Sequence, residues 1–182
     1  SDEEVKAGDF NPKMYNSFTD GTKAAIEMAA VSNATGLDCP DNGLAFYPTG
    51  LHDPTNVFKP VAKGGRLPKE GILDIAASRE PDGREVYNNI CYGMFVTFKA
   101  PNEYSRDCFR QYGLLTDLSG WYASMWRPFH MIGLETNTSI MSAVLRNEPT
   151  GVSSLWKADA IATAKRDLSA GEMLDGEGGF CV

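Results

Sequence analysis

The feature that most constrains this sequence is a polar turn followed directly by an alanine-rich apolar segment. Residues 16–23 (NSFTDGTK) carry many hydrogen-bonding side chains, and residues 24–31 (AAIEMAAV) follow without a break. Thr19 or Asp20 can cap a helix at this point, and Gly36 suits the left-handed position that ends one. We therefore expect a helix from about Asp20 to the residue before Gly36. Its many alanines indicate close packing against another element.

The start of this helix is a candidate anion site, because a helix N-terminus presents free N–H groups and a positive dipole end. Lys23, Asp20 and Glu27 lie within one or two turns of it. In one interpretation Asp20 is only a cap, and Lys23 and Glu27 form an exposed ion pair of little energetic value. In the other, Lys23 faces a phosphate or carbonyl oxygen with a carboxylate beside it. The residues alone leave both open.

A second candidate site lies in residues 126–136 (WRPFHMIGLET). The guanidinium of Arg127 has a geometry suited to phosphate or carboxylate, and His130 can transfer protons or bind a metal. Glu135 could act as a base, a metal ligand or an ion-pair partner. The alternative is a structural role, with a buried His130 and with Arg127 stacked on a tryptophan.

Weaker candidates lie in the proline-rich region and at a strand end. His52 and Asp53 are typical of a surface turn, although they could also serve catalysis. Residues 63–66 (KGGR) form a basic loop that could cover an anionic substrate, but a Gly-Gly pair is first of all a turn signal. Lys99 ends a predicted strand. The sequence contains no G-x-G-x-x-G, P-loop, G-x-S-x-G or H-E-x-x-H motif.

The remaining pattern mixes helix and strand signals, which predicts an α+β fold with a mixed sheet and packed helices. The expected elements are a loop-like entry over residues 1–15, a long irregular region over 38–70, strands over 84–99, 121–126 and 157–165, an ambiguous segment over 104–112, and a helix from Asn137 or Thr138 to Arg146.

Charge and cysteine content exclude several classes of protein. The net charge of -7 and the lack of any Lys/Arg run argue against a nucleic-acid or membrane partner. The four cysteines form no C-x-x-C pair, so we expect free thiols, no zinc site and a cytoplasmic location. We also expect a homo-oligomer, because the alanine-rich helix and the many Trp and Tyr residues could supply an interface. The acidic start and the glycine-rich end indicate a piece of a longer polypeptide.

Three segments together resemble one known family. They are residues 11–29 (NPKMYNSFTDGTKAAIEMA), 126–135 (WRPFHMIGLE) and 158–172 (ADAIATAKRDLSAGE). This combination is similar to the homoserine-dehydrogenase-like oxidoreductases that carry a C-terminal SAF domain, and within them to the 1-deoxy-D-xylulose 5-phosphate reductoisomerase-like class. The resemblance implies a catalytic domain over residues 1–155, the beginning of a β-rich SAF module over 156–182, and an upstream NAD(P)-binding domain outside this chain.

The resemblance also implies a reaction. The substrate rearranges, NADPH supplies a hydride, and the product is 2-C-methyl-D-erythritol 4-phosphate, a precursor of isoprenoids. The implied catalytic residues are Lys23, Asp20 and His130. The residues implied to bind the phosphorylated substrate are Asn16, Ser17, Thr22 and Arg127. A divalent metal, Mg or Mn, is implied on Asp20, Glu27 and Glu135.

Two alternatives remain beside this prediction. The closely spaced acidic triplet of well-known reductoisomerases is not found here, which leaves a homoserine-dehydrogenase-type enzyme acting on a small aldehyde or keto substrate. A non-catalytic sugar-acid-binding protein is the second alternative, because SAF modules also occur outside dehydrogenases.

Overall fold

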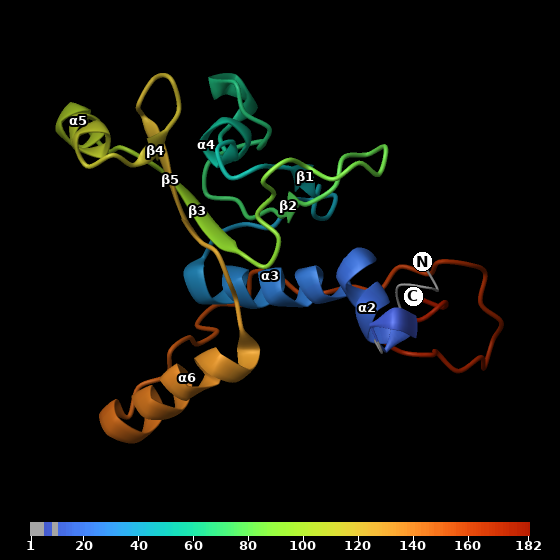
Figure 1. The fold of residues 1–182 in the computed structure, drawn as a ribbon. Helices are drawn as coiled ribbons and strands as arrows, with labels where there is room; N and C mark the ends of the chain where they lie inside the picture. The colour runs from blue at the N-terminus through green and yellow to red at the C-terminus, as the bar shows by residue number, and fades with distance from the viewer. Residues whose placement is uncertain (1–5, 9–10) are drawn as a thin grey trace. The chain divides into compact units, whose positions relative to one another are not determined.

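The computed structural model describes residues 6–8 and 11–182, and the chain divides into two compact units. One unit consists of Ser1–Cys39 and Ser153–Val182, and the other of Pro40–Val152. Helices accompany small sheets, so the fold is α+β as predicted (Figure 1). None of the described helices has the length and apolar content needed to cross a bilayer. The predicted domain boundary near residue 155 stays a prediction.

The first unit contains two consecutive helices, α2 (Pro12–Thr19) and α3 (Thr22–Thr35). The expectation of a loop up to residue 15 is wrong from Pro12 onward, and its first part lies largely outside the described residues. Asn11 caps α2, because its side-chain oxygen accepts hydrogen bonds from the N–H groups of Lys13 and Met14 at 3.0 and 3.3 Å. Pro12 occupies the first helical position, where its missing N–H costs nothing.

The helix predicted from the alanine-rich segment is confirmed as α3, with a start two residues later than expected. Gly21 precedes it with a φ of 86°. Gly36 ends it in the left-handed conformation, with a φ of 79°, and the Gly36 N–H donates to the Ser32 carbonyl. The prediction that Gly36 ends this helix is therefore confirmed.

The segment from Ser153 to the C-terminus has no described helix or strand, so the strand predicted over residues 157–165 is wrong. Asn33 on α3 holds the start of this segment. Its side-chain oxygen accepts from the N–H groups of Lys157 and Ala158, and its amide donates to the Ala158 carbonyl at 2.9 Å. The Asn33 side chain thus satisfies backbone groups that in a sheet would pair with a neighbouring strand. The segment is also rich in alanine, which has little preference for strands.

The second unit contains two separate small sheets. Strands β3 (Met94–Lys99), β5 (Tyr122–Arg127) and β4 (Leu115–Thr116) form an antiparallel sheet in the order β3-β5-β4. Strands β1 (Tyr47–Pro48) and β2 (Ala76–Ala77) pair in parallel. Parallel and antiparallel pairings are therefore both present, but each has its own sheet.

Both strand predictions in this unit located real strands. The strand expected over residues 121–126 is confirmed as β5. Of the strand expected over 84–99, only β3 forms, and it ends at Lys99 as predicted. Residues 84–93 form turns and isolated bridges instead, and Asn88 and Tyr92 adopt positive φ angles of 48° and 62°. Such angles interrupt an extended strand.

Three helical segments lie between these strands, and a fourth, α6, follows the last strand. Their bounds are α4 (Pro54–Val57), the 3₁₀ helix η1 (Val61–Lys63), α5 (Glu103–Gln111) and α6 (Ile132–Arg146). The region over 38–70 is largely irregular, as expected, and the ambiguous segment over 104–112 is mostly helix α5. Helix α6 ends at Arg146 as predicted, but it begins several residues early because Met131 takes the N-cap position.

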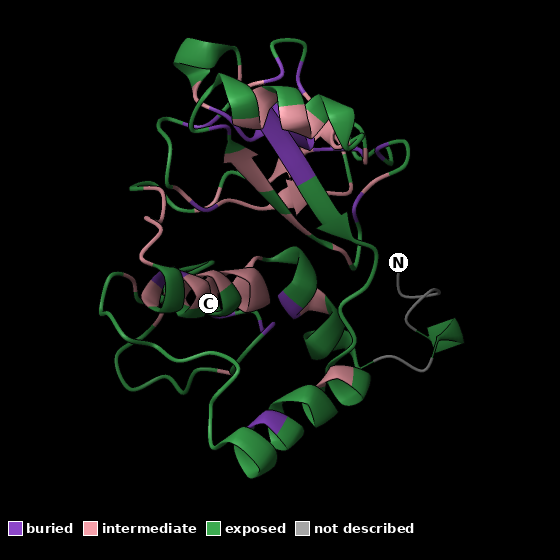
Figure 2. Ribbon diagram, turned by 90° about the vertical axis from the view of Figure 1, so that its left-hand side faces the viewer, coloured by how far each residue is buried: buried purple, intermediate pink, exposed green. Residues whose placement is uncertain are grey.

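The core of the second unit lies against the first half of β5. Along this strand the residues are buried from Tyr122 to Ser124 and exposed from Met125 to Arg127, a change that is visible in Figure 2. Aromatic contacts extend this core, with ring centroids 4.5 Å apart between Phe58 and Phe95. The exposed half of β5 leads away from this core to α6.

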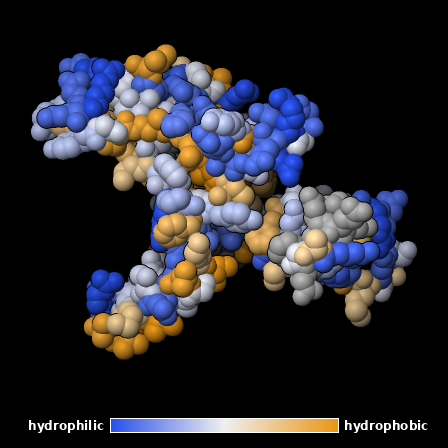
Figure 3. Space-filling view, viewed as in Figure 1, coloured by the Kyte–Doolittle hydropathy of each residue, from blue (hydrophilic) through white to orange (hydrophobic). Residues whose placement is uncertain are grey.

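Helix α6 carries many exposed hydrophobic side chains, and Figure 3 shows them as a cluster on the helix. They include Ile132, Leu134, Ile140, Met141, Val144 and Leu145. A face of this kind is typical of a surface that packs against something else. The homo-oligomer expected from the sequence stays a prediction.

Candidate functional site

The side chains of Arg127, His130 and Glu135 meet where β5 ends and α6 begins. One carboxylate oxygen of Glu135 accepts a hydrogen bond from the Met131 N–H at 3.0 Å and contacts His130 Nδ1 at 2.9 Å. The other oxygen forms an ion pair with Arg127. The Arg127 guanidinium also lies 4.8 Å from the centroid of the Phe129 ring. The structure thus brings together three residues that the sequence singled out.

Glu135 is the anionic centre of this cluster. Burial alone would raise the pKa of Glu135, but the Met131 N–H, His130 and the charge of Arg127 outweigh it and hold the pKa below its usual value. The side chains of His130 and Arg127 are 45% and 49% exposed. The interpretation with a buried His130 is therefore wrong. Glu135 fixes one nitrogen of His130 while much of the ring stays accessible to a ligand.

Asn16 and Ser17, which were predicted to bind the substrate near the start of α3, form hydrogen bonds within their own unit. The Asn16 amide donates to the Gly178 carbonyl at 2.9 Å. The Ser17 hydroxyl donates to the Met14 carbonyl at 2.7 Å, and Ser17 is fully buried. Ser17 would have to leave this hydrogen bond to reach a ligand.

Asp20 connects the start of α3 to the C-terminal segment. One of its oxygens accepts from both the N–H and the hydroxyl of Thr22, at 3.0 and 2.7 Å. The other forms an ion pair with Lys165 at 2.8 Å, and the Asp20 side chain is 11% exposed. Burial would raise the pKa of Asp20, but Lys165 and Thr22 outweigh it and lower the pKa. Asp20 is therefore an anion whose two oxygens are both engaged.

Lys23 makes a looser set of contacts in the same unit. It pairs with Glu177 at 3.4 Å, and its ammonium lies 5.1 Å from the centroid of the Phe18 ring. Glu27, the partner considered from the sequence, is exposed. Lys23 is more available to a ligand than Asp20, because a single long ion pair is weak.

The residues predicted to hold a metal do not form a metal site. Across residues 6–8 and 11–182, no group of three or more His, Cys, Asp or Glu side chains could hold an ion. Asp20 and Glu27 belong to one unit and Glu135 to the other. The oxygens of Asp20 and Glu135 already face cations and N–H donors. The described donors therefore do not fit the predicted magnesium or manganese ion.

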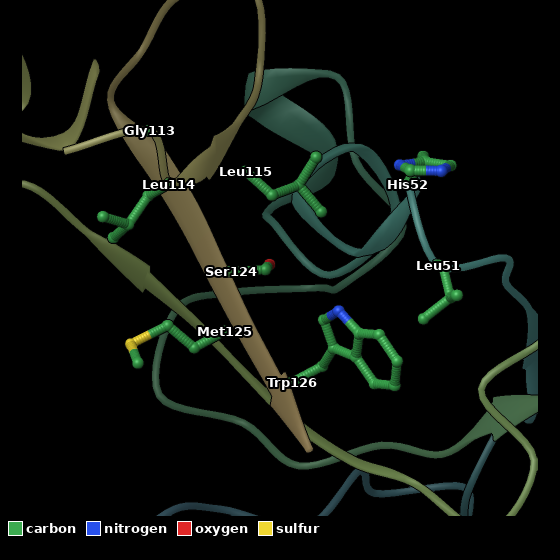
Figure 4. Close-up of a pocket in the computed structure, with 8 residues that line it drawn as sticks. All are labelled: Leu51, His52, Gly113, Leu114, Leu115, Ser124, Met125 and Trp126. Atoms are coloured by element: carbon green, nitrogen blue, oxygen red, sulfur yellow. The ribbon is translucent and has the colours of Figure 1, made fainter. Parts of the chain in front are cut away.

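A pocket of about 420 Å³ lies beside His52 in the second unit, between β4, β5 and the loop before α4. Figure 4 shows Leu51, Leu115 and Trp126 among the mostly apolar residues that line it. Asp53 Oδ2 accepts a hydrogen bond from the Gly50 N–H at 3.3 Å, so this carboxylate closes a turn. The interpretation of Asp53 as a turn residue is thereby supported.

A second pocket, of about 510 Å³, contains Lys63 and Lys99, which the sequence offered as weaker candidates, but the pocket itself was not predicted. Its lining includes Lys59, Lys63, Lys99, Asp117, Leu118, Ser119, Trp121 and Tyr122. At its base the Lys59 ammonium forms an ion pair with Asp117 at 2.8 Å, with side-chain exposures of only 9% and 5%. These two residues are 58 positions apart and belong to no motif, so no local signal could have paired them.

Burial and hydrogen bonds set the charge states of Asp117 and Tyr122 in this pocket. Burial would raise the pKa of Asp117, but Lys59, Ser119 and the Tyr122 N–H outweigh it and lower the pKa. Burial, together with the hydrogen bond to Glu70, raises the pKa of Tyr122 to about 12. At neutral pH, Asp117 is thus an anion and Tyr122 a neutral hydrogen-bond donor.

Comparison with family models gives a match over most of the chain. Residues 1–136 match the family model described as "Oxidoreductase DRL, catalytic domain". A comparison with curated proteins finds no match to this chain. The matched region includes every site residue predicted from the sequence, from Asn16 to Glu135, and it also contains the pocket between Lys59 and Tyr122. Residues 158–172, on which the SAF prediction depends, lie outside it.

Proposed function

The chain belongs to the family of oxidoreductase DRL catalytic domains, and from this premise we propose that it is the catalytic part of an NADPH-dependent reductoisomerase. The proposed reaction converts 1-deoxy-D-xylulose 5-phosphate to 2-C-methyl-D-erythritol 4-phosphate. The observation that carries the proposal is the extent of the match, because residues 1–136 include both segments that resemble such enzymes around the predicted site. An oxidoreductase family also favours an enzyme over a non-catalytic sugar-acid-binding protein.

The nucleotide is assigned mainly to a separate domain. NADPH, when bound, supplies the hydride of the reduction. This chain has no G-x-G-x-x-G fingerprint to hold the pyrophosphate. Its own residues are therefore proposed to bind the phosphorylated substrate, to orient it and to move protons.

His130 is proposed as the group that takes a proton from a substrate hydroxyl during the rearrangement. Glu135 holds the ring through Nδ1 at 2.9 Å, which leaves Nε2 as the nitrogen for proton transfer. Arg127, paired with Glu135 and about half exposed, is proposed to contact the phosphorylated substrate. Glu135 then acts on the substrate through these two neighbours.

Lys23 and Asp20 belong to the other unit, and a role at the start of α3 is proposed for them separately from the Arg127 cluster. Lys23 is proposed to donate a proton to the substrate oxygen as the hydride arrives, because its ion pair with Glu177 is long, at 3.4 Å. Asp20 keeps Lys165 and Thr22 in place beside it. Thr22 and Asn16 are proposed to contact the substrate at the same helix start. No step is assigned to a metal, since the described donors do not fit one.

A homoserine-dehydrogenase-type reaction on a small aldehyde or keto substrate is the second candidate. The observation that favours it is the donor set, because Asp20 and Glu135 are engaged by cations rather than gathered at one point. Reduction of an aldehyde by NADPH needs a proton donor such as Lys23. It does not need a metal ion that holds two oxygens of the substrate. Comparing 1-deoxy-D-xylulose 5-phosphate with aspartate semialdehyde as substrates of the full-length protein separates the two reactions.

Substitution of His130 tests the site directly. In the full-length protein we expect His130→Ala to lower kcat/KM for the phosphosugar about 100-fold, since a positioned general base contributes roughly 10²- to 10⁴-fold. Arg127→Ala should mainly raise KM, because it removes a substrate contact. Both effects are measured from the initial rates of NADPH consumption.

The matched control is Arg84→Ala. Arg84 also forms an ion pair in the second unit, with Asp82 at 2.7 Å, but it is largely exposed and lies outside the proposed site. The kcat/KM of the Arg84→Ala variant should equal that of the wild type. Unchanged kcat/KM in both His130→Ala and Arg127→Ala would show that this cluster does not take part in the reaction.

A further inference from the structure

The pocket between Lys59 and Tyr122 lies at the far end of β5 from Arg127. Tyr122 begins this strand and Arg127 ends it, so the two residues are about 17 Å apart at the usual rise of an extended strand. Lys99, which also lines the pocket, pairs with Tyr122 at the same end. The pocket volume of about 510 Å³ is within the range of small-molecule sites. A small molecule in this pocket is therefore separate from one that Arg127 holds.

Lys59 lies at the base of the pocket and keeps hydrogen-bonding capacity for a ligand. Its ammonium donates to Asp117 Oδ2 at 2.8 Å, and its side chain is only 9% exposed. Asp117 also accepts from the Ser119 hydroxyl at 2.8 Å and from the Tyr122 N–H at 3.3 Å, and these contacts hold the carboxylate in place. An ammonium has three N–H donors, so the hydrogen bond to Asp117 leaves two of them for a ligand.

Glu70 marks a position beside the pocket where a negative charge is stabilised. Its Oε1 accepts hydrogen bonds from Lys99 at 3.0 Å and from the Tyr122 hydroxyl at 2.8 Å. These hydrogen bonds, together with the charges of Lys99 and Lys63, lower the pKa of Glu70. Two residues of the pocket lining therefore already bind a carboxylate oxygen. The Glu70 side chain is 51% exposed, and such an exposed pair is weak enough to give way to another anion.

The charge of the lining matches that of a phosphate group. The buried pair of Lys59 and Asp117 is neutral as a unit. When Glu70 turns to solvent, Lys63 and Lys99 leave two positive charges in the pocket without a carboxylate. A phosphate monoester carries close to two negative charges and three strong acceptor oxygens. It can therefore accept hydrogen bonds from the base and from the walls at the same time.

We propose that this pocket binds a phosphate group that does not belong to the substrate, either as inorganic phosphate or at the end of a small phosphomonoester. Lys63 and Lys99 contact the phosphate oxygens from the walls, and Lys59 contacts them from the base. The Tyr122 hydroxyl, released from Glu70, donates a further hydrogen bond. This site does not depend on the proposed function, because it holds a different ligand.

The test titrates inorganic phosphate into the full-length protein and follows binding by phosphorus NMR at constant ionic strength. The background is Arg127→Ala, which lacks the contact proposed for the phosphorylated substrate. We expect this protein to bind phosphate, and Lys63→Gln combined with Lys99→Gln (the wall variant) to weaken the binding at least tenfold. Lys59 is left intact, because removing one partner of a buried pair can unfold the protein. Circular dichroism verifies that each variant is folded.

Two further variants in the same background sharpen the test. Glu70→Gln removes the competing carboxylate and should tighten phosphate binding several-fold. Lys157→Gln is the matched control for the wall lysines. Lys157, like Lys99, is a partly exposed lysine in an ion pair, here with Asp38, and it belongs to the other unit. The Lys157→Gln protein should bind phosphate as tightly as the background does.

Glycerol 3-phosphate, titrated in the same way, distinguishes the two sources of phosphate. Tighter binding than that of inorganic phosphate identifies a phosphomonoester, whose carbon chain can lie on the apolar surface of Trp121. Equal affinity identifies free phosphate as the ligand. Undetectable phosphate binding by Arg127→Ala, or equal binding by the wall variant, would overturn the proposal. A raised KM for the phosphosugar when the wall lysines are replaced with Arg127 intact would also overturn it, because the pocket would then serve the substrate.

Discussion

At the scale of single residues, the most consequential contact is the ion pair between Lys59 and Asp117. Burying two charges is costly, and their attraction repays the cost only with good geometry and with additional hydrogen bonds. Asp117 has good geometry toward Lys59, and its carboxylate accepts additional hydrogen bonds from the Ser119 hydroxyl and the Tyr122 N–H. Such a pair stabilises little by itself, but the loss of either partner leaves a buried charge without compensation.

We therefore expect Asp117→Asn to destabilise the protein by about 3 kcal/mol, as is typical when one partner of a buried pair is removed. The measurement is the free energy of unfolding from urea titrations. Asp82→Asn is the control, because Asp82 forms an exposed pair with Arg84, and its unfolding curve should match that of the wild type. Equal unfolding curves for the wild type, Asp117→Asn and Asp82→Asn would show that the loss of one partner of the buried pair does not destabilise the protein.

The same pair predicts a pH dependence. The folded-state pKa of Asp117 lies below its usual value of 3.8. The carboxylate therefore contributes stability above that value, and the contribution is lost as the pH falls through the lowered pKa. Asp117→Asn should make the acid limb of the stability curve shallower.

At the scale of elements, the sequence predicted helices best where their ends carry strong signals. Gly36 marked the end of α3 because only glycine adopts a φ of 79° without strain. Pro12 lies within the entry that was expected to be a loop, although it stands at the first position of α2, where proline is favoured. Residues 157–165 were taken as a strand, but their anchor is Asn33, which is distant in sequence.

Gly36→Ala tests the end of α3. The new methyl group would force a left-handed alanine and lie 3.3 Å from Leu155 Cδ1. We expect a loss of about 1–2 kcal/mol in the free energy of unfolding. Gly133→Ala is the matched control, because Gly133 lies within α6 in open space and alanine favours a helix there by up to about 1 kcal/mol. The midpoints of urea unfolding of the two variants should shift in opposite directions. Equal shifts would show that Gly36 has no special role at the end of α3.

At the scale of the whole molecule, local patterns predicted the fold class and the family resemblance predicted an oxidoreductase, but neither predicted the second pocket. The α+β class followed from the mixture of helix and strand signals. The cluster of Arg127, His130 and Glu135 was found because its members are close in sequence. Lys59 and Asp117 were missed because their pairing depends on how a loop and a strand connection pack. Long-range contacts of this kind have no local signature.

We propose that the protein is an oxidoreductase that rearranges and reduces a phosphorylated sugar. The most direct measurement follows NADPH consumption by the full-length protein with 1-deoxy-D-xylulose 5-phosphate and identifies the product by NMR. We expect one molecule of 2-C-methyl-D-erythritol 4-phosphate to form for each NADPH consumed. No NADPH consumption with this substrate, in a protein that consumes NADPH with aspartate semialdehyde, would contradict it.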